Sequence, residues 1–318
     1  MTANVETMAY ANATPWHGIG TPVSSELTTD EMLKSASLDW LVLKKPAMVD
    51  VGEDGPVFGE DWFMLVRDKD KKILGPCGKK YVPIQNKEIF DFLKKFVEAG
   101  HMTLETAGSL DGGRQVWALA KLNKGFKVVK GDDVEGYLLI SLPHIWGKAG
   151  IIQFTPIRVV CMNTLVMALQ SQSSGKFRFP HIQSFSAVEY AAEEALGISV
   201  ELLNQFKEQS QHLSKRKYTE HKLEQYIATL FQPDVAKAKQ GDIRPQFKRT
   251  AMDAYDCVHR QPTVKSVEGS WWNALNGVTY YTDHVAGQDR AKALESAWYG
   301  QRAALKRKAL DLAIEYAK

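Results

Sequence analysis

The pattern of apolar and polar residues changes about halfway along the chain. Before residue 160, short segments rich in branched and aromatic residues predominate, which is typical of β-strands. After that point, apolar residues recur every three or four positions, the spacing of one helix face. The sequence therefore predicts an α+β fold, with an antiparallel β-meander and helices followed by a helical C-terminal segment.

The strand pattern predicts a series of antiparallel pairs. Residues 50–59 are rich in turn formers and are interpreted as a loop. Asp111-Gly112-Gly113 suits a tight hairpin turn, because its Asp-Gly step tolerates positive φ. The predicted strands cover residues 40–45, 62–67, 104–110, 115–122, 136–142 and 151–161.

Two helices are predicted within this first half. Thr28 and Glu31 form a capping-box pattern that opens a short helix through Ala36. Asn86 is the predicted N-cap of a second helix, which Gly100 ends.

The second half is predicted to be helical. Asn163 would cap a helix over residues 164–169. Ser186 and Glu189 form another capping box, opening a helix that Gly197 would break and Ser199 would restart. Further helices are predicted over residues 220–231, 244–258, 271–282 and 290–317.

The last of these helices carries an apolar stripe that includes Leu305 and Ala309, with Lys306 off the stripe. The sequence contains no internal repeat and no low-complexity linker. The change of period divides the chain into an α+β core domain at 1–185 and a helical region at 186–318 that lies on or beside it.

The charge of the chain is unevenly distributed. Its net charge is +3, but residues 201–318 carry 19 Lys and Arg against 14 Asp and Glu, a net of +5, which leaves −2 for residues 1–200. Nucleic-acid-binding domains usually have a pI above about 9. The modest excess of basic residues is too small to indicate nucleic-acid binding and does not exclude it.

Composition also bears on location and cofactors. Cys77, Cys161 and Cys257 lie far apart and predict neither a disulfide framework nor a Cys-x-x-Cys metal site. Cys257 and His259 could supply two metal ligands, but a buried structural thiol is the favoured interpretation. The chain has no apolar run of about 18 residues and no signal-peptide pattern. We expect a cytoplasmic protein of the host cell, without membrane span, metal or cofactor.

The sequence offers little support for catalysis. It contains no His-x-x-x-His and no Gly-x-Ser-x-Gly motif. Asp132 lies in a Gly-flanked turn, where turn chemistry explains it. Asp283 and His284 could be an acid–base pair, but neighbouring helix residues point in different directions. We therefore expect no enzyme and no catalytic residue.

Two isolated residues are candidate ligand contacts. Trp16, in Pro15-Trp16-His17-Gly18-Ile19-Gly20, could stack on a ligand or could anchor an N-terminal arm turned by glycines. Arg158 lies in an apolar strand, where burial is costly unless the charge is paired. It would either pair with an interior carboxylate or face a surface that binds anions.

Basic and aromatic residues interleave at Lys148 and in Lys176-Phe177-Arg178-Phe179-Pro180-His181. A groove for single-stranded nucleic acid needs this combination, because cations follow the phosphates and aromatic rings stack on bases. Trp271 is spaced with Leu275 and Val278 as a helix face, which favours a place in the core. The predicted phosphate contacts are Arg158, Lys148, Lys176 and Arg178, and the predicted stacking residues are Phe177 and Trp16.

Three segments carry a family resemblance: Trp16-His17-Gly18-x-Gly20, Arg158-Val159-Val160-Cys161-x-Asn163-Thr164-Leu165 and Trp272-x-Ala274-x-Asn276-x-Val278-Thr279-x-Tyr281. Because of these segments, the chain resembles the phage/plasmid-like protein family, whose members share a domain of unknown function numbered 932. That resemblance implies a protein encoded on phages, prophages or plasmids, and no established activity. At the level of fold, the order of elements is similar to phage single-strand annealing proteins of the RecT and Redβ type, which form rings or filaments.

Three functional hypotheses follow. The first is a phage-encoded, homo-oligomeric protein that binds single-stranded DNA and assists recombination or replication. An alternative is a protein-interaction module that acts on a host factor, for example in anti-defence. A third is an enzyme with a dispersed nucleotide or metal site.

Overall fold

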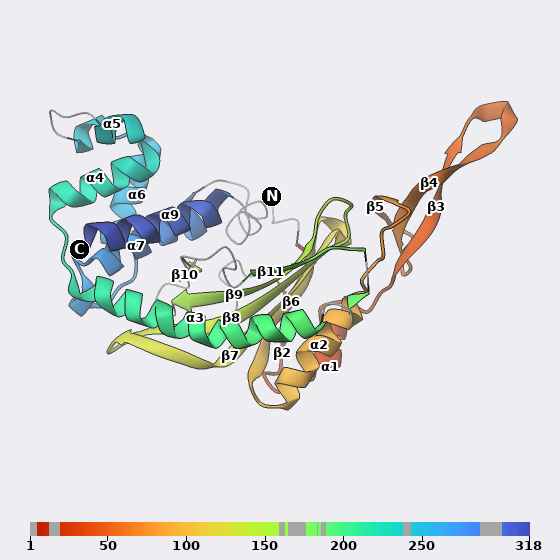
Figure 1. Ribbon diagram of the computed structural model, residues 1–318, viewed down its shortest axis with the longest axis horizontal. Helices are drawn as coiled ribbons and strands as arrows, with labels where there is room; N and C mark the ends of the chain where they lie inside the picture. Colours follow the sequence, from red (N-terminus) through yellow and green to blue (C-terminus); the bar gives the residue numbers. More distant parts are fainter. Residues whose placement is uncertain are drawn as a thin grey trace.

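The computed structural model describes residues 5–12, 20–158, 163–164, 176–182, 184–185, 189–237, 243–286 and 301–318. The fold is α+β, as predicted. A large sheet lies in the middle of an elongated molecule, with a cluster of helices at one end and a projecting hairpin at the other (Figure 1).

The large sheet has the strand order β10-β9-β8-β7-β6-β1-β2, and β11 also pairs with β9. Its pairs are antiparallel except β1 and β2, which are parallel. The predicted turn is confirmed, because Asp111, Gly112 and Gly113 have φ of 51°, 67° and 88°. The strands are β1 (Val5–Ala11), β2 (Thr21–Val23), β6 (Met102–Leu110), β7 (Gln115–Val129), β8 (Asp132–Pro143), β9 (Gly150–Arg158), β10 (Asn163–Thr164) and β11 (Lys176–Phe179).

A second sheet consists of β3 (Val42–Asp50), β4 (Pro56–Arg67) and β5 (Ile73–Gly78). The predicted loop over residues 50–59 is too long, because only residues 51–55 connect the two strands of the β3–β4 hairpin, through a short 3-10 turn at Gly52–Asp54, and β4 already begins at Pro56. Valines at positions 49 and 57 face each other across that hairpin and favour strand over loop.

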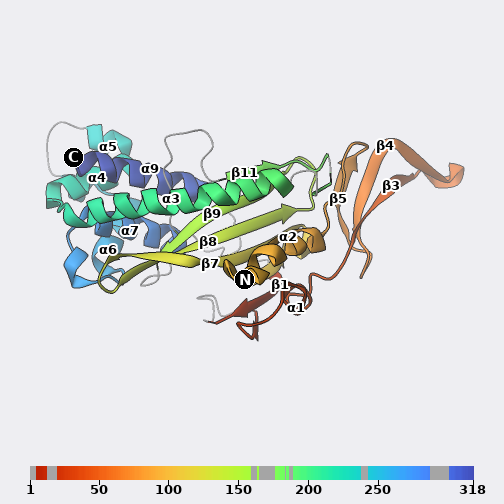
Figure 2. The same ribbon diagram turned by 60° about the horizontal axis from the view of Figure 1, so that its bottom comes forward.

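The large sheet is contacted by α1 (Thr29–Ser35), α2 (Asn86–Glu98) and α3 (Glu189–Lys215), and at β10 also by α7 (Trp271–Tyr280) (Figure 2). The Thr28–Glu31 capping box is confirmed. The predicted cap of α2 is off by one residue: Gln85 is the N-cap, and its backbone N–H donates to Glu88 at 2.6 Å. Asn86 is instead buried, and its amide donates to the Leu38 carbonyl.

The helices lie on one face of the sheet, over two adjoining cores. Leu138 belongs to the core beneath α1 and α2, whereas Val134 belongs to the core that α3 shares with the C-terminal helices. Both residues occupy even positions of β8, so they share a sheet face. Leu122, in β7, packs against both cores and marks their junction.

Two predictions after β9 are wrong. Asn163 does not cap a helix, because Asn163–Thr164 is strand β10, paired with Arg158 and Ile157 of β9. Gly197 does not break a helix, because α3 runs without interruption through Gly197 and Ser199. A glycine inside a helix is about 1 kcal/mol less favourable than an alanine, and the contacts of α3 with β7, β9 and β11 compensate this loss of helix stability. Ser186 and residues 165–169 lie outside the described residues.

The helical end matches the sequence in part. The helix over residues 220–231 is confirmed, whereas the helix predicted over 244–258 is a 3-10 turn at Arg244–Gln246 followed by α6. Residues 290–300 of the last predicted helix lie outside the described residues. The helices are α4 (Glu220–Phe231), α5 (Pro233–Lys237), α6 (Arg249–Arg260), α7 (Trp271–Tyr280), with a π-helical turn at Tyr281–Val285, and α9 (Gln301–Tyr316).

Two charged residues lie inside this end of the molecule, against expectation. Asp132 is fully buried and accepts a hydrogen bond from the indole nitrogen of Trp272 at 2.9 Å, so turn chemistry does not explain it. Lys306 is buried on α9 rather than off its apolar stripe, and its ammonium pairs with Asp283 at 2.5 Å. Trp271, Leu275 and Val278 are buried as predicted.

Candidate anion pocket between β7 and α3

A bulge in β7 forms one wall of an open pocket. The β7–β8 register moves from Lys121 opposite Tyr137 to Gly125 opposite Glu135, so β7 has two extra residues. Bulges of this kind re-aim side chains and occur often beside functional sites. Gly125 is required here, because a Cβ at this position would lie 2.8 Å from the Val134 carbonyl oxygen.

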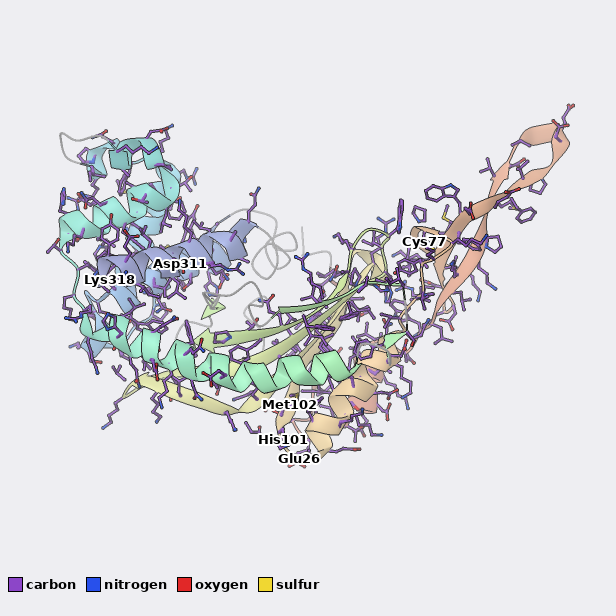
Figure 3. All side chains as sticks on the ribbon, in the orientation of Figure 1. Glu26, Cys77, His101, Met102, Asp311 and Lys318 are labelled. Carbon is purple, nitrogen blue, oxygen red and sulfur yellow. The ribbon has the colours of Figure 1, made fainter. Side chains whose placement is uncertain are left out.

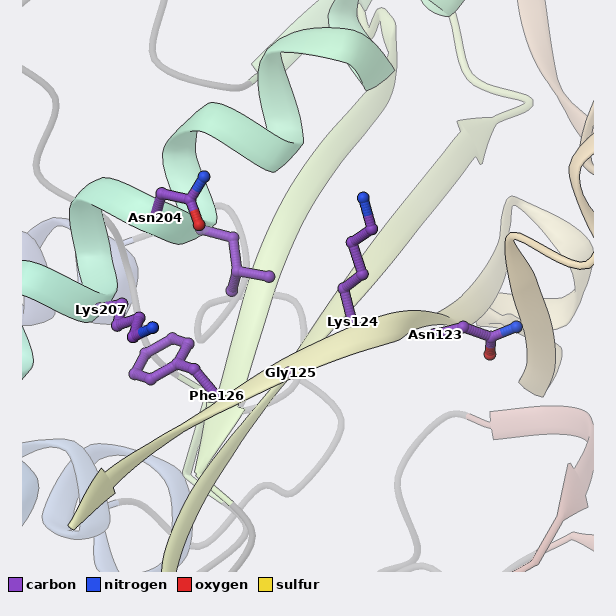
Figure 4. Close-up of a pocket in the computed structure, with 7 residues that line it drawn as sticks. Asn123, Lys124, Gly125, Phe126, Asn204 and Lys207 are labelled. Atoms are coloured by element: carbon purple, nitrogen blue, oxygen red, sulfur yellow. The ribbon is translucent and has the colours of Figure 1, made fainter.

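The pocket encloses about 300 Å³ and opens to solvent between the bulge and α3 (Figure 4). Asn123 anchors the bulge, since its side chain donates to the Gly100 carbonyl at 2.6 Å and its backbone N–H donates to His101 at 3.0 Å. The lining residues are Asn123, Lys124, Gly125 and Phe126 from β7 and Leu203, Asn204 and Lys207 from α3.

The electrostatics of the pocket differ from those of its surroundings. Neighbouring Lys121 is neutralised by Glu135 at 2.6 Å, and Lys127 by Asp133 at 3.8 Å. In the part of the chain that the structure describes, Lys124 and Lys207 have no ion-pair partner, and both are exposed. The pocket therefore presents two uncompensated ammonium groups.

An aromatic ring lies beside Lys207, whereas the Lys124 side chain extends away from that ring (Figure 4). Phe126 is half-buried, lines the pocket, and packs edge-on against Phe206 of α3 with 6.2 Å between ring centroids. Cations next to a partly exposed ring can bind a phosphate together with an attached planar group.

Of the predicted phosphate contacts, Arg158 is nearest to this pocket in the sheet. Phe126, Val134 and Arg158 are successive register partners across β7, β8 and β9. Two strand spacings separate positions 126 and 158, which is about 10 Å. The hydrophobic position opposite Arg158, Val134, faces the helices.

The other predicted contacts lie toward the opposite end of β9. Arg178 pairs with Ile151, seven residues from Arg158, or about 23 Å along a strand. Lys148 is exposed in the preceding loop, and Lys176 is opposite Gln153. Phe177 is half-buried and packs against the core beneath α2. Trp16 lies outside the described residues.

Sequence reasoning missed Lys124 and Lys207. Asn123-Lys124-Gly125 interrupts the alternation of a long strand, and a glycine inside a strand indicates a bulge. That signal could have located the β7 wall. Nothing in the sequence shows that Lys207, more than 80 residues later, would face the same space.

A pair of buried histidines lies away from this pocket, where β5 meets the large sheet. His144 is fully buried and its Nε2 contacts the Asn86 side-chain oxygen at 2.8 Å. His181 is stacked on Tyr81, with ring centroids 4.7 Å apart. Burial lowers the pKa of His144 to about 3, with a smaller contribution from His181. Burial also lowers the pKa of His181 to about 4, against the weaker opposite effect of the Val82 and Pro143 backbone.

Further features considered in the sequence can be followed in the described residues. These residues contain no group of three or more His, Cys, Asp or Glu placed to hold a metal ion. Cys257 is a buried thiol, and burial raises its pKa to about 11. Asp283 pairs with Lys306, whereas His284 packs on Tyr280, so the two neighbours do not act together. None of the described helices has the length and apolar character needed to cross a bilayer.

Comparison with known proteins gives a family and no activity. No curated protein and no solved structure matches the chain. A family model described as "Domain of unknown function (DUF932)" matches residues 73–308, which include both walls of the pocket and begin after the β3–β4 hairpin. Because this match covers well over half of the 318 residues, the chain belongs to the DUF932 family.

Proposed function

We propose that this protein binds single-stranded DNA and acts as an annealing-type protein in recombination or replication, encoded by a phage or plasmid. The observation that carries the proposal is the pocket lined by Lys124, Lys207 and Phe126, in which neither lysine has an ion-pair partner among the described residues. In this proposal, the two ammonium groups contact backbone phosphates and the ring stacks on a base.

The chemistry of the pocket favours a single strand over other polyanions. A free phosphate would use the cations but not the ring, whereas a nucleotide chain uses both. Stacking contributes about 1–3 kcal/mol per base and depends little on sequence. The Asn204 amide at the rim adds a polar group that suits bases or sugars.

In this proposal, the path of the strand stays at the open side of the pocket between β7 and α3. Such a path needs only a few local cations, which fits a chain whose net charge is +3. Arg158 lies in the row of Phe126, about 10 Å away, but the buried Val134 lies between them, so position 158 does not continue the pocket. Arg178 alternates with Phe177 and Phe179, which pack in the core beneath α2, so it lies on the other face of the sheet from the pocket and would need a separate segment of strand.

A direct test compares two double variants of the full-length protein. Lys124→Gln/Lys207→Gln removes both pocket cations. The matched control, Lys69→Gln/Lys79→Gln, removes two exposed lysines near the second sheet and changes the net charge equally. Binding to a labelled thymidine oligonucleotide is measured by fluorescence anisotropy at low salt.

We expect the pocket variant to bind at least tenfold more weakly and the control to bind like the wild type. Phe126→Leu keeps the packing against Phe206 and should weaken binding through lost stacking. Equal losses in both double variants would show that only overall charge matters. Absence of oligonucleotide binding by the wild type would refute the function itself, and an RNA oligomer of equal length establishes the preferred strand.

A further inference from the structure

The hairpin formed by β3 and β4 projects far from the rest of the molecule (Figure 1). We call residues 47–61 the arm. β4 pairs with β5 only from Trp62 to Val66, so the arm has two strands, and within the described part of the chain both of its edges are unpaired. Isolated two-stranded hairpins are at best marginally stable in water, and unpaired edges readily join other chains.

Both faces of the arm are apolar. Met48 is opposite Phe58, and these side chains are 57% and 61% exposed. Val49 is opposite Val57 on the other face, with 63% and 54% exposed. Exposed apolar groups gathered in this way indicate a surface that another molecule covers. The side chains of the arm extend outward without a neighbouring helix or strand (Figure 3).

The arm is also strongly acidic. It contains five carboxylates and no Lys or Arg, and one of the five, Asp61, pairs with Lys79 at 3.5 Å; the other four are Asp50, Glu53, Asp54 and Glu60. This charge opposes nucleic acid and anionic membranes as partners, because both carry negative charge. It also opposes pairing of one arm with the arm of a second copy, since like charges would face each other. The partner must present a basic protein surface.

The chain itself carries such a surface at its other end. Residues 201–318 have a net charge of +5, and the α3–α4 connection presents Lys215 and Arg216, both exposed. This connection lies at the end of the molecule opposite the arm (Figure 1). An acidic end and a basic end on one elongated chain are complementary in a head-to-tail arrangement.

We infer that the arm docks on the basic helical end of a second copy of this chain. Its carboxylates pair with the surface around Lys215 and Arg216, and Met48 and Phe58 become buried. The contact is heterologous, because two different surfaces meet. Repeated copies therefore form a closed ring or an open filament rather than a two-fold dimer.

The test measures the mass of the full-length protein by size-exclusion chromatography with light scattering, over a range of concentrations. The wild type should form assemblies of several chains. Met48→Thr/Phe58→Thr should reduce the mass to a single chain. Ile182→Thr, a control at an apolar residue that is 64% exposed outside the arm, should leave the assembly intact. Circular dichroism melting confirms that each variant folds, since these side chains lie outside both cores.

A charge exchange identifies the receiving surface. Glu53→Lys/Glu60→Lys and Lys215→Glu/Arg216→Glu should each dissociate the assembly, and the two sets combined in one chain should restore it. The inference is overturned if the wild type is a single chain at every concentration, if the arm variants keep the wild-type mass, or if the combined exchange restores nothing. A single-chain wild type that captures a different basic protein would likewise overturn self-assembly. None of these outcomes depends on oligonucleotide binding.

Discussion

The buried histidines predict that the protein loses stability between pH 7 and pH 5. In the folded state the pKa values of His144 and His181 are about 3 and about 4, and in an unfolded chain each is about 6.5. The unfolded state therefore binds more protons throughout this interval. Stability is fully present above pH 6.5 and falls as the pH drops toward the folded values.

The size of the loss follows from the shifts. One pKa unit corresponds to about 1.36 kcal/mol, so each histidine removes about 2 kcal/mol of unfolding free energy by pH 5. Both rings are almost completely buried, His144 at 0% and His181 at 4% exposed, so solvent screening does not reduce the effect. Together they remove about 4 kcal/mol, a large share of the 5–15 kcal/mol typical of a domain.

The variant His181→Phe removes the contribution of His181 to this pH dependence and keeps that of His144. The phenyl ring can keep the stacking on Tyr81, so the fold is retained while one titration is removed. Two carboxyls, Glu105 and Asp311, act in the opposite sense, because burial raises their pKa values. The wild type and His181→Phe both contain these two carboxyls, so their effect cancels when the two proteins are compared.

Urea denaturation followed by circular dichroism at several pH values between 7 and 5 measures the effect. The wild type should lose about 4 kcal/mol and His181→Phe about 2 kcal/mol. His221→Asn, which changes an exposed histidine of α4, should follow the wild type. The reasoning is refuted if wild-type stability is flat over this interval, or if His181→Phe keeps the full dependence.

The remaining predictions concern the helical end and one cap. Lys306→Met should cost about 3–5 kcal/mol in urea denaturation because it removes the buried ammonium that pairs with Asp283, and Asp283→Leu in the same chain should recover most of that loss. Gly277→Ala should destabilise by about 1–3 kcal/mol, since its Cβ would lie 2.4 Å from a Val258 side-chain carbon, and an unchanged denaturation midpoint would contradict the close α6–α7 contact. Thr28→Ala should cost about 1 kcal/mol through loss of the α1 cap, measured by thermal unfolding.

The sequence predicted local structure well where short-range chemistry decides it. The Thr28–Glu31 capping box, the Asp111–Gly113 turn and the helix over residues 220–231 each depend on neighbouring residues, and all three are present. The α+β class followed from the change of hydrophobic period alone.

Errors arose where distant contacts override local preference. Gly197 is tolerated inside α3 because the sheet supports that helix. Asn163 lies in a strand because β9 offers it a partner. Asp132 and Lys306 are charged residues that the sequence places at the surface. In the structure they are buried, where Asp132 accepts a hydrogen bond from Trp272 and Lys306 forms an ion pair with Asp283. None of these partners can be read from sequence spacing.

The candidate site was harder to predict than the fold. Its walls come from a β7 bulge and from α3, more than 70 residues apart, and only their packing places Lys124 and Lys207 around one space. The sequence instead predicted the site at clusters of basic and aromatic residues. In the structure these clusters lie toward the other end of β9.

The salt dependence of oligonucleotide binding tests the anion pocket most directly. For a single strand, the slope of log affinity against log salt concentration is about −0.7 per phosphate contact. If Lys124 and Lys207 each contact a phosphate, Lys124→Gln/Lys207→Gln should make that slope shallower by about 1.4, while Lys69→Gln/Lys79→Gln leaves it unchanged. A pocket variant with the wild-type slope would show that these lysines contact no phosphate.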